Sequence, residues 1–202
     1  MMIVDTVARL RTLYPAPKDR ALKKQLCALD AHCRRYVELA PFVVLASSDA
    51  ALALDASPRG GAPGFVKAID AHTLLIPDAP GNSRLDTLEN IIATGSVGLL
   101  FMIPGIDETL RVNGAARLSC LAAHLDACRD ARRRPALVIE VSVVHAYLHC
   151  AKAFMRSRLW QPDARVERSR LPTIGQMIND QIGAQAPAET REQMLARYEA
   201  DL

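Results

Sequence analysis

Aromatic residues are scarce in this chain of 202 residues: phenylalanine, tryptophan and tyrosine together make up 4%, although half of the residues are hydrophobic. The interior must therefore be filled mainly by Val, Leu, Ile and Ala. Long apolar runs are also missing, because no segment approaches the ~20 apolar residues that a membrane-spanning helix needs. The start of the chain carries Asp5 and no basic segment before an apolar run, so we expect no signal peptide.

Cysteine pairs and motifs of metal or nucleophile chemistry are missing as well. The five cysteines are odd in number and show neither CxxC spacing nor a paired histidine motif, which argues against zinc and favours reduced thiols in a cytoplasmic protein. Neither G-x-S-x-G nor H-E-x-x-H occurs. The formal charge is +3 and is scattered except at 132–134, so a small anionic ligand fits better than nucleic acid.

The order of apolar runs predicts one domain of mainly β (α+β) class. Residues 1–40 read as N-terminal packing helices over 5–13 and 18–39, and residues 161–202 as a C-terminal helical tail. Between them, 41–160 forms the body. The predicted strands are 42–48, 51–57, 65–70, 73–77, 97–104, 108–118 and 136–144. Short antiparallel strands joined by tight turns suggest a barrel or a sandwich.

The stretch 81–92 is organised as a helix between two strands. Asn82 or Ser83 can cap its first turn, and apolar residues follow at helical spacing. A helix that starts in this way points free N–H groups and its positive dipole end outward, where Arg84 adds a charge, so an anion site is expected. The alternative is that Arg84 is a solvated arginine on an ordinary amphipathic helix.

Two further segments carry polar groups that could face a cleft. In strand 108–118, Arg111 and Asn113 alternate with apolar positions. Residues 145–160 read as a helix on which Lys152, Arg156 and Trp160 recur every four residues, a set that suits a phosphate and a planar ring. A surface stripe with Trp160 packed on the barrel is equally consistent with this spacing. His145 and His149 could donate protons, although a structural role is the commoner one.

Taken together, these pieces resemble the pyridoxamine 5'-phosphate oxidase-like flavoproteins, and more closely an FMN-dependent branch whose substrates are mostly unassigned. The similarity runs from about 42 to 160. It is carried by the hairpin 42–57, Pro58-Arg59-Gly60-Gly61, Gly64-Phe65-Val66-Lys67, Gly81-Asn82-Ser83-Arg84-Leu85, Leu99-Leu100-Phe101, Arg111-Val112-Asn113-Gly114-Ala115-Ala116, Cys150-Ala151-Lys152-Ala153 and Arg156-Ser157-Arg158-Leu159-Trp160. The ordered set is specific, whereas no single motif is.

The resemblance implies an antiparallel split β-barrel of six to seven strands and a homodimer with FMN at the subunit interface. The FMN-binding residues that it implies are Gly64, Phe65, Val66, Lys67, Ile76, Pro77, Asp78, Asn82, Arg84, Leu85, Arg111, Asn113, Lys152, Arg156 and Trp160. Among them, Asn82 and Arg84 would hold the phosphate. The last five would reach the flavin from the partner subunit.

The chain departs from the oxidases that make pyridoxal phosphate. Their Ser-Arg-Lys-Gly run is replaced by Asn82-Ser83-Arg84-Leu85, and their Arg-rich C-terminal substrate segment has no counterpart. The expected function is therefore an FMN-dependent oxidoreductase that transfers a hydride to or from a small organic substrate, with NAD(P)H as a possible donor and no catalytic side chain assigned. The alternative is a non-catalytic FMN or haem carrier with the same barrel.

Overall fold

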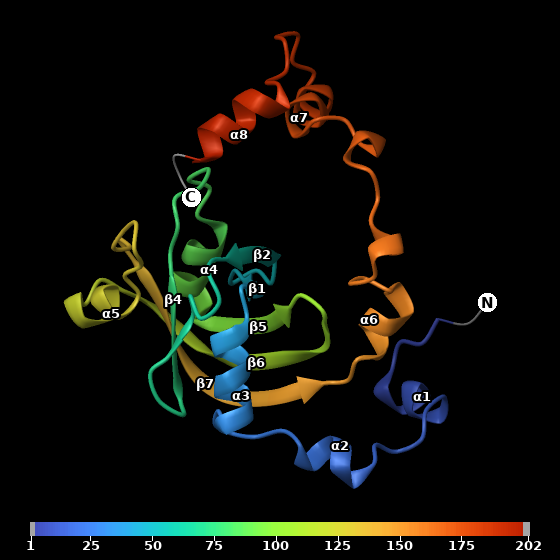
Figure 1. Ribbon diagram of the computed structural model, residues 1–202. Helices are drawn as coiled ribbons and strands as arrows, with labels where there is room; N and C mark the ends of the chain where they lie inside the picture. Colours follow the sequence, from blue (N-terminus) through green and yellow to red (C-terminus); the bar gives the residue numbers. More distant parts are fainter. Residues whose placement is uncertain (1–2, 200–202) are drawn as a thin grey trace.

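The protein was analysed as a computed structural model, which describes residues 3–199. Seven antiparallel strands form one sheet in the order β2-β1-β5-β6-β7-β4-β3 (Figure 1). Their bounds are β1 Phe42–Ser48, β2 Leu54–Gly60, β3 Lys67–Ala68, β4 Thr73–Pro77, β5 Ser96–Ile103, β6 Ile106–Ser119 and β7 Val138–His149. The predicted α+β class, with an antiparallel split barrel of six to seven strands, is confirmed.

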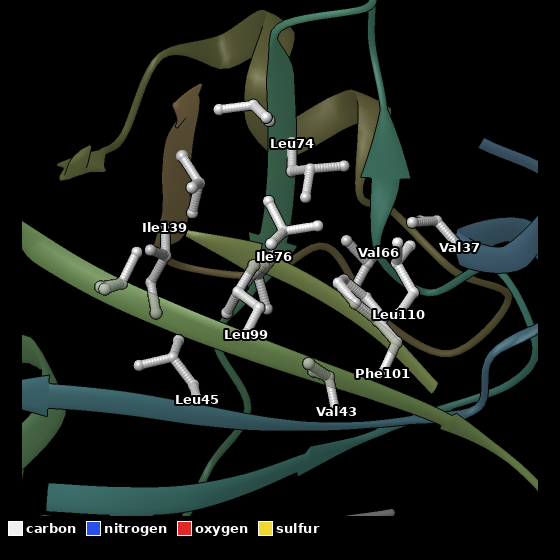
Figure 2. Close-up of a cluster of buried hydrophobic side chains, with 14 of the residues drawn as sticks. Val37, Val43, Leu45, Val66, Leu74, Ile76, Leu99, Phe101, Leu110 and Ile139 are labelled. Carbon is white, nitrogen blue, oxygen red and sulfur yellow. The ribbon is translucent and has the colours of Figure 1, made fainter. Parts of the chain in front are cut away.

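The core shows that the sheet curls around itself. Leu45 on β1, Leu99 and Phe101 on β5, and Ile76 on β4 belong to one buried cluster, although β1 and β4 are far apart in the strand order. Figure 2 shows these side chains pointing toward one another. Aliphatic residues dominate the cluster, as the low aromatic content requires, and its large members are excluded from water, the main driving force for folding.

Some of the helices pack against the curved sheet. The bounds are α1 Val7–Thr12, α2 Asp19–Lys23, α3 Ala31–Leu39, α4 Asp86–Thr94, α5 Ala122–Ala127, α6 Lys152–Ser157, α7 Ile174–Ile182 and α8 Arg191–Glu199, with 3-10 turns at Pro162–Ala164 and Arg168–Arg170. Helices α3 and α4 contribute Val37 and Ile91 to the main cluster, whereas α5 packs Leu125 on a separate cluster with Leu75. None of the helices in residues 3–199 has the length and apolarity that crossing a membrane requires.

The single helix predicted over 18–39 is wrong, because the chain forms α2 and α3 with an extended link between them. Leu26 and Ala146 exchange two backbone hydrogen bonds, each 2.9 Å long. This contact joins residues far apart in the sequence, so helical spacing alone could not reveal it.

Asp30 begins α3 as its N-cap, and its carboxylate accepts a 2.8 Å hydrogen bond from the backbone N–H of Cys33. That bond lowers the pKa of Asp30 from its ordinary value of 3.8. We expect Asp30→Ala to lower the free energy of unfolding in urea by about 1 kcal/mol at neutral pH. Asp30→Asn is the matched control and should cost less, because its amide oxygen can still cap the helix.

The effect of Asp30→Ala should depend on pH in a defined direction. A depressed folded-state pKa gives stability that is present above the unfolded-state value and is lost as pH falls through the folded value. Wild type and Asp30→Ala should therefore converge in acid. A difference that persists undiminished below the folded-state pKa would contradict this role of the carboxylate.

The predicted helix over 145–160 is also wrong in its first part, since β7 continues to His149 and α6 begins only at Lys152. The reason is register: β6 extends to Ile106, and its Thr109 pairs with His149. Backbone groups at 145–149 are thus used in a sheet. Arg158, at φ 53°, ends the helix, so Trp160 lies beyond it.

Two strand predictions shift in a way that affects the site. The second strand of the hairpin is Leu54–Gly60 instead of 51–57, because Asp49 accepts hydrogen bonds from the N–H groups of Ala51 and Ala53 and lengthens the turn. Arg59 thereby lies in a strand and pairs with Val43. The strand predicted over 65–70 is reduced to Lys67–Ala68.

Candidate functional site

A cavity of about 560 Å³ lies between the ends of β2 and β4, the loop 79–85 and the start of α4. Its lining residues include six of the residues predicted to bind FMN, namely Phe65, Pro77, Asp78, Asn82, Arg84 and Leu85. Volumes of about 300–1,000 Å³ are typical of small-molecule sites. The structure thus brings these six of the predicted FMN-binding residues together around one cavity.

Arg59 is the lining residue with an unsatisfied buried group. Its Nη1 donates to the carbonyl of Pro58 at 2.9 Å, while its Nε is buried and has no hydrogen-bond partner. No carboxylate in residues 3–199 forms a salt bridge with it. A buried N–H of this kind costs about 1–3 kcal/mol unless a ligand accepts it, so Arg59 is suited to an anion.

The loop before α4 adopts a strained backbone conformation. Ser83 and Leu85 both have φ near 59°, a left-handed conformation that costs L-residues about 1–2 kcal/mol each. Asn82 Oδ1 accepts a hydrogen bond from the backbone N–H of Arg84 at 3.1 Å. The predicted cap at Asn82 or Ser83 is therefore wrong, because this local turn delays the helix until Asp86 and leaves Leu85 as its N-cap without a side-chain bond.

Arg84 lines this cavity and forms an ion pair with Asp86. Its Nε lies 2.8 Å from Asp86 Oδ2, and this contact raises the pKa of Arg84 above its ordinary value. Asp86 also occupies the first turn of α4, where the helix dipole favours negative charge. An anionic ligand that binds Arg84 must therefore compete with Asp86, a feature that the sequence pattern did not indicate.

A hydrogen-bond network anchored on Asp55 supports the wall of the cavity. The Asp55 carboxylate accepts from Ser57 Oγ at 3.0 Å and from Thr87 Oγ1, and so joins β2 to α4. Asn90 adds a second link from α4, donating to Ser47 Oγ at 3.1 Å. These contacts fix the start of the helix relative to the strand that carries Arg59.

The other predicted residues near this cavity differ in what they can offer. Val66 and Ile76 are 2% and 0% exposed as whole residues and belong to the core cluster, so neither offers free surface to this cavity. Lys67 Nζ donates to the carbonyl of Gly64 at 2.7 Å. The N–H of Asp78 donates to the carbonyl of Leu137 at 2.9 Å.

The remaining predicted residues do not line this cavity. Arg111 donates to the hydroxyl of Tyr147 at 2.9 Å across β6 and β7. Asn113 lines a shallow groove of about 430 Å³ formed by β1, β2, β5, β6 and β7. Trp160 donates from Nε1 to the carbonyl of Ile106 at 2.9 Å. Lys152 and Arg156 are exposed on α6.

Three titratable side chains outside the cavity have pKa values that their surroundings shift. Burial raises the pKa of Cys33 and of Cys128 to about 11 each, so these thiols stay protonated and unreactive. On β7, burial together with the charges of Arg111 and Lys24 lowers the pKa of His149.

Residues 29–150 match the sequence profile of a protein family described as Pyridoxamine 5'-phosphate oxidase, which is more than half of the chain. The chain belongs to this family. The matched segment begins before α3, ends just after β7, and contains the whole cavity. The family match thus covers the curved sheet and the candidate site but neither end of the chain.

Several solved structures are similar to part of the chain at low sequence identity. HupZ from Group A Streptococcus has 15% sequence identity and a TM-score of 0.49, covering 60% of this chain and 99% of that one. A putative pyridoxamine 5'-phosphate oxidase from Lactobacillus delbrueckii has 18% identity and a TM-score of 0.48, covering 61% and 98%. An FMN-binding protein from Syntrophomonas wolfei has 14% identity and a TM-score of 0.40, covering 58% and 88%. No curated protein matches the sequence.

Sequence reasoning missed Arg59 and the Asp55 network as parts of the site. Arg59 stands in the run Pro58-Arg59-Gly60-Gly61, whose glycines are typical of a loop, and only the register of β2 with β1 shows that it is a strand residue beside the cavity. The signal available in the sequence was an arginine that follows alternating apolar positions. Nothing in the sequence indicated that its Nε would be buried without a partner.

Proposed function

We propose that the protein is a flavoprotein that binds FMN in the cavity between β2, β4 and α4. The observation that supports this most strongly is the meeting of Arg59, whose buried Nε has no partner, with Arg84 in one cavity at the start of α4. Both arginines would hold the phosphate, since guanidinium groups form strong paired hydrogen bonds with phosphate oxygens. Family membership makes a flavin phosphate the best-supported anion.

The flavin ring would extend from the phosphate along segments 64–67 and 76–78. Phe65 and Pro77 line the cavity there and provide apolar surface for a planar ring. Leu85 lines the same space from the loop. When bound, FMN supplies hydride and electron transfer, while the protein supplies position and electrostatics.

A homodimer is part of this proposal. Arg111, Asn113, Lys152, Arg156 and Trp160 do not line the cavity of their own chain. They could contact the same ligand only if a second copy presented them. We therefore propose that each FMN lies where two copies meet, with these five residues contributed by the partner.

The proposed activity is that of an FMN-dependent oxidoreductase acting on a small organic substrate, with NAD(P)H as a possible electron donor. One observation favours a second candidate, an FMN carrier: none of the described residues that line the cavity is His, Cys, Lys or Tyr. The same absence in the described lining argues against haem, whose iron needs an axial ligand such as His, Cys, Met or Tyr. The five free thiols suit a reducing, cytoplasmic setting.

The purified chain tests this proposal directly. We expect a flavin absorption band after purification, or saturable binding of added FMN by the colourless chain. Anaerobic NADH or NADPH should bleach the band if the protein is an enzyme, whereas a flavin that no common donor reduces would favour the carrier. A preparation that remains colourless and does not bind added FMN would refute the proposal.

Arg84→Ala should weaken FMN binding at least about tenfold, the loss expected for one charge-assisted hydrogen bond to phosphate. Riboflavin, which has no phosphate, is the control ligand. The variant should bind riboflavin almost as tightly as the wild type does. Fluorescence titration of both flavins measures this difference. Equal FMN affinity in wild type and variant would remove Arg84 from the phosphate site.

A further inference from the structure

The C-terminal arm, residues 161–199, departs from the rest of the fold. Figure 1 shows it curving away from α6 to α7, which stands apart from the sheet, and then turning back through α8. No side chain in residues 161–199 is buried. The family match ends at residue 150, so the arm lies outside the segment that defines the family.

The root of the arm is nevertheless fixed. The indole N–H of Trp160 donates to the carbonyl of Ile106, and its ring stacks on Phe154 at 5.4 Å between centroids. Arg158 forms a 2.6 Å ion pair with Asp163 just beyond it. The arm therefore leaves the body from a defined position at the start of β6.

The contacts within the arm are mainly polar, among them the ion pair of Arg197 with Glu189 and the hydrogen bond from Asn179 to the carbonyl of Ala186. Helices α7 and α8 have nine residues each, and isolated helices shorter than about 12–15 residues are marginal in water. Ordering each backbone residue costs about 1–2 kcal/mol, which burial of apolar surface normally offsets. Residues of the arm are at most half-buried, so most of its apolar surface could be covered only by a surface outside the arm.

An apolar stripe on α7 shows where such a surface would bind. Ile174, Ile178 and Ile182 follow one another at four-residue intervals on one side of the helix, and they are 39%, 46% and 70% exposed. Val166, Leu171, Leu195 and Tyr198 expose further apolar surface along the arm. An apolar stripe exposed on a helix in this way is typical of an interaction site.

We infer that the C-terminal arm packs against the body, residues 41–150, of a second copy of this chain. The area suits this occupant: seven exposed apolar side chains on each of two arms could bury on the order of 1,000 Å² in total, about what a specific interface needs. In a two-fold dimer the same contact forms twice. The body also exposes apolar surface that an arm could cover, with Leu54 and Val144 87% and 49% exposed.

The inference rests on the homodimer within the proposed function and names the segment that holds it together, but it does not require flavin. Two single-charge variants of the full chain test it. Ile178→Glu places a charge on the apolar stripe, and Gln176→Glu places the same charge two residues away on the opposite side of α7. Both positions are exposed in the single chain. Gln176→Glu removes the 2.6 Å hydrogen bond that Gln176 donates to Asp180, so far-ultraviolet circular dichroism of both variants checks that α7 stays folded.

Sedimentation equilibrium should show a wild-type dimer. Ile178→Glu is expected to raise the dimer dissociation constant at least about tenfold, because two apolar contacts are lost per dimer. Gln176→Glu should change the constant less than about twofold. A monomeric wild type, or a dimer that Ile178→Glu leaves unchanged, would overturn the inference.

A photo-cross-linking amino acid at position 182 identifies the occupant. After mixing with an isotope-labelled copy, we expect cross-links from the arm to residues 41–150 of the other copy. Cross-links only to the arm's own copy would overturn the inference in favour of a fold-back arm. Flavin content, measured on the same samples, separates the two proposals, since a colourless arm-linked dimer would refute only FMN binding.

Discussion

The double variant Arg59→Ala, Arg84→Ala is expected to bind FMN at least about 100-fold more weakly than the wild type. Each arginine should contribute about 1.5–3 kcal/mol as a charged hydrogen-bond donor to phosphate, and tenfold in affinity corresponds to about 1.4 kcal/mol. Arg59 has no competing carboxylate in the described residues, whereas Arg84 must leave Asp86. Arg59→Ala alone should therefore cost at least as much as Arg84→Ala.

Fluorescence titration with FMN and with riboflavin measures this loss. Riboflavin affinity should change little, because the ring contacts remain. Arg20→Ala, which removes an exposed arginine on α2 outside the cavity, controls for the change in net charge. If both flavins lose affinity equally, the arginines hold the structure of the site rather than the phosphate.

Gly114→Ala is expected to lower the free energy of unfolding by about 3 kcal/mol, near the upper end of the usual cost of overpacking. Gly114 lies on β6 in the middle of the sheet and pairs with Val97 on one side and Val143 on the other. A Cβ at this position would lie 2.2 Å from the carbonyl oxygen of Ser142, so the strands would have to separate.

The close approach has a structural cause. The register between β6 and β7 shifts between Asn113 and Gly114, and the extra residue on β7 bends the sheet sharply at this point. Only a residue without a side chain allows the two backbones to come so near. Gly114 therefore helps to set the curvature that brings β4 toward β1 and closes the core.

Urea unfolding of Gly114→Ala and of Gly81→Ala tests this role. A Cβ at Gly81 would meet nothing within 4 Å, so that variant should unfold close to the wild-type midpoint. A Gly114→Ala midpoint equal to that of Gly81→Ala would show that the sheet can relax around the added methyl group.

Several elements could be predicted from the sequence because their signals are local. Strands 42–48 and 73–77 were predicted with the bounds that the structure shows, since alternating or continuous apolar residues end at polar or proline positions. The pattern of 81–92 indicated a helix between two strands, and that helix is α4. The cavity gathers six of the predicted binding residues because they lie on neighbouring segments of the chain.

Other features depended on contacts between distant segments, which no local pattern records. Helix α3 starts late because Leu26 pairs with Ala146, and β7 runs to His149 because β6 is long enough to pair with it. The pairing of Arg84 with Asp86 depends on a left-handed turn at Ser83 and Leu85, residues that rarely adopt it.

The sequence by itself determined the family and the α+β class, because apolar periodicity and an ordered set of motifs are local properties of the chain. Only the tertiary structure decided that Arg59 reaches the cavity with an unsatisfied Nε and that residues 161–199 bury none of their side chains. The physical reason is that burial is a property of the surroundings: whether a group is covered, and by what, depends on segments far away in the chain.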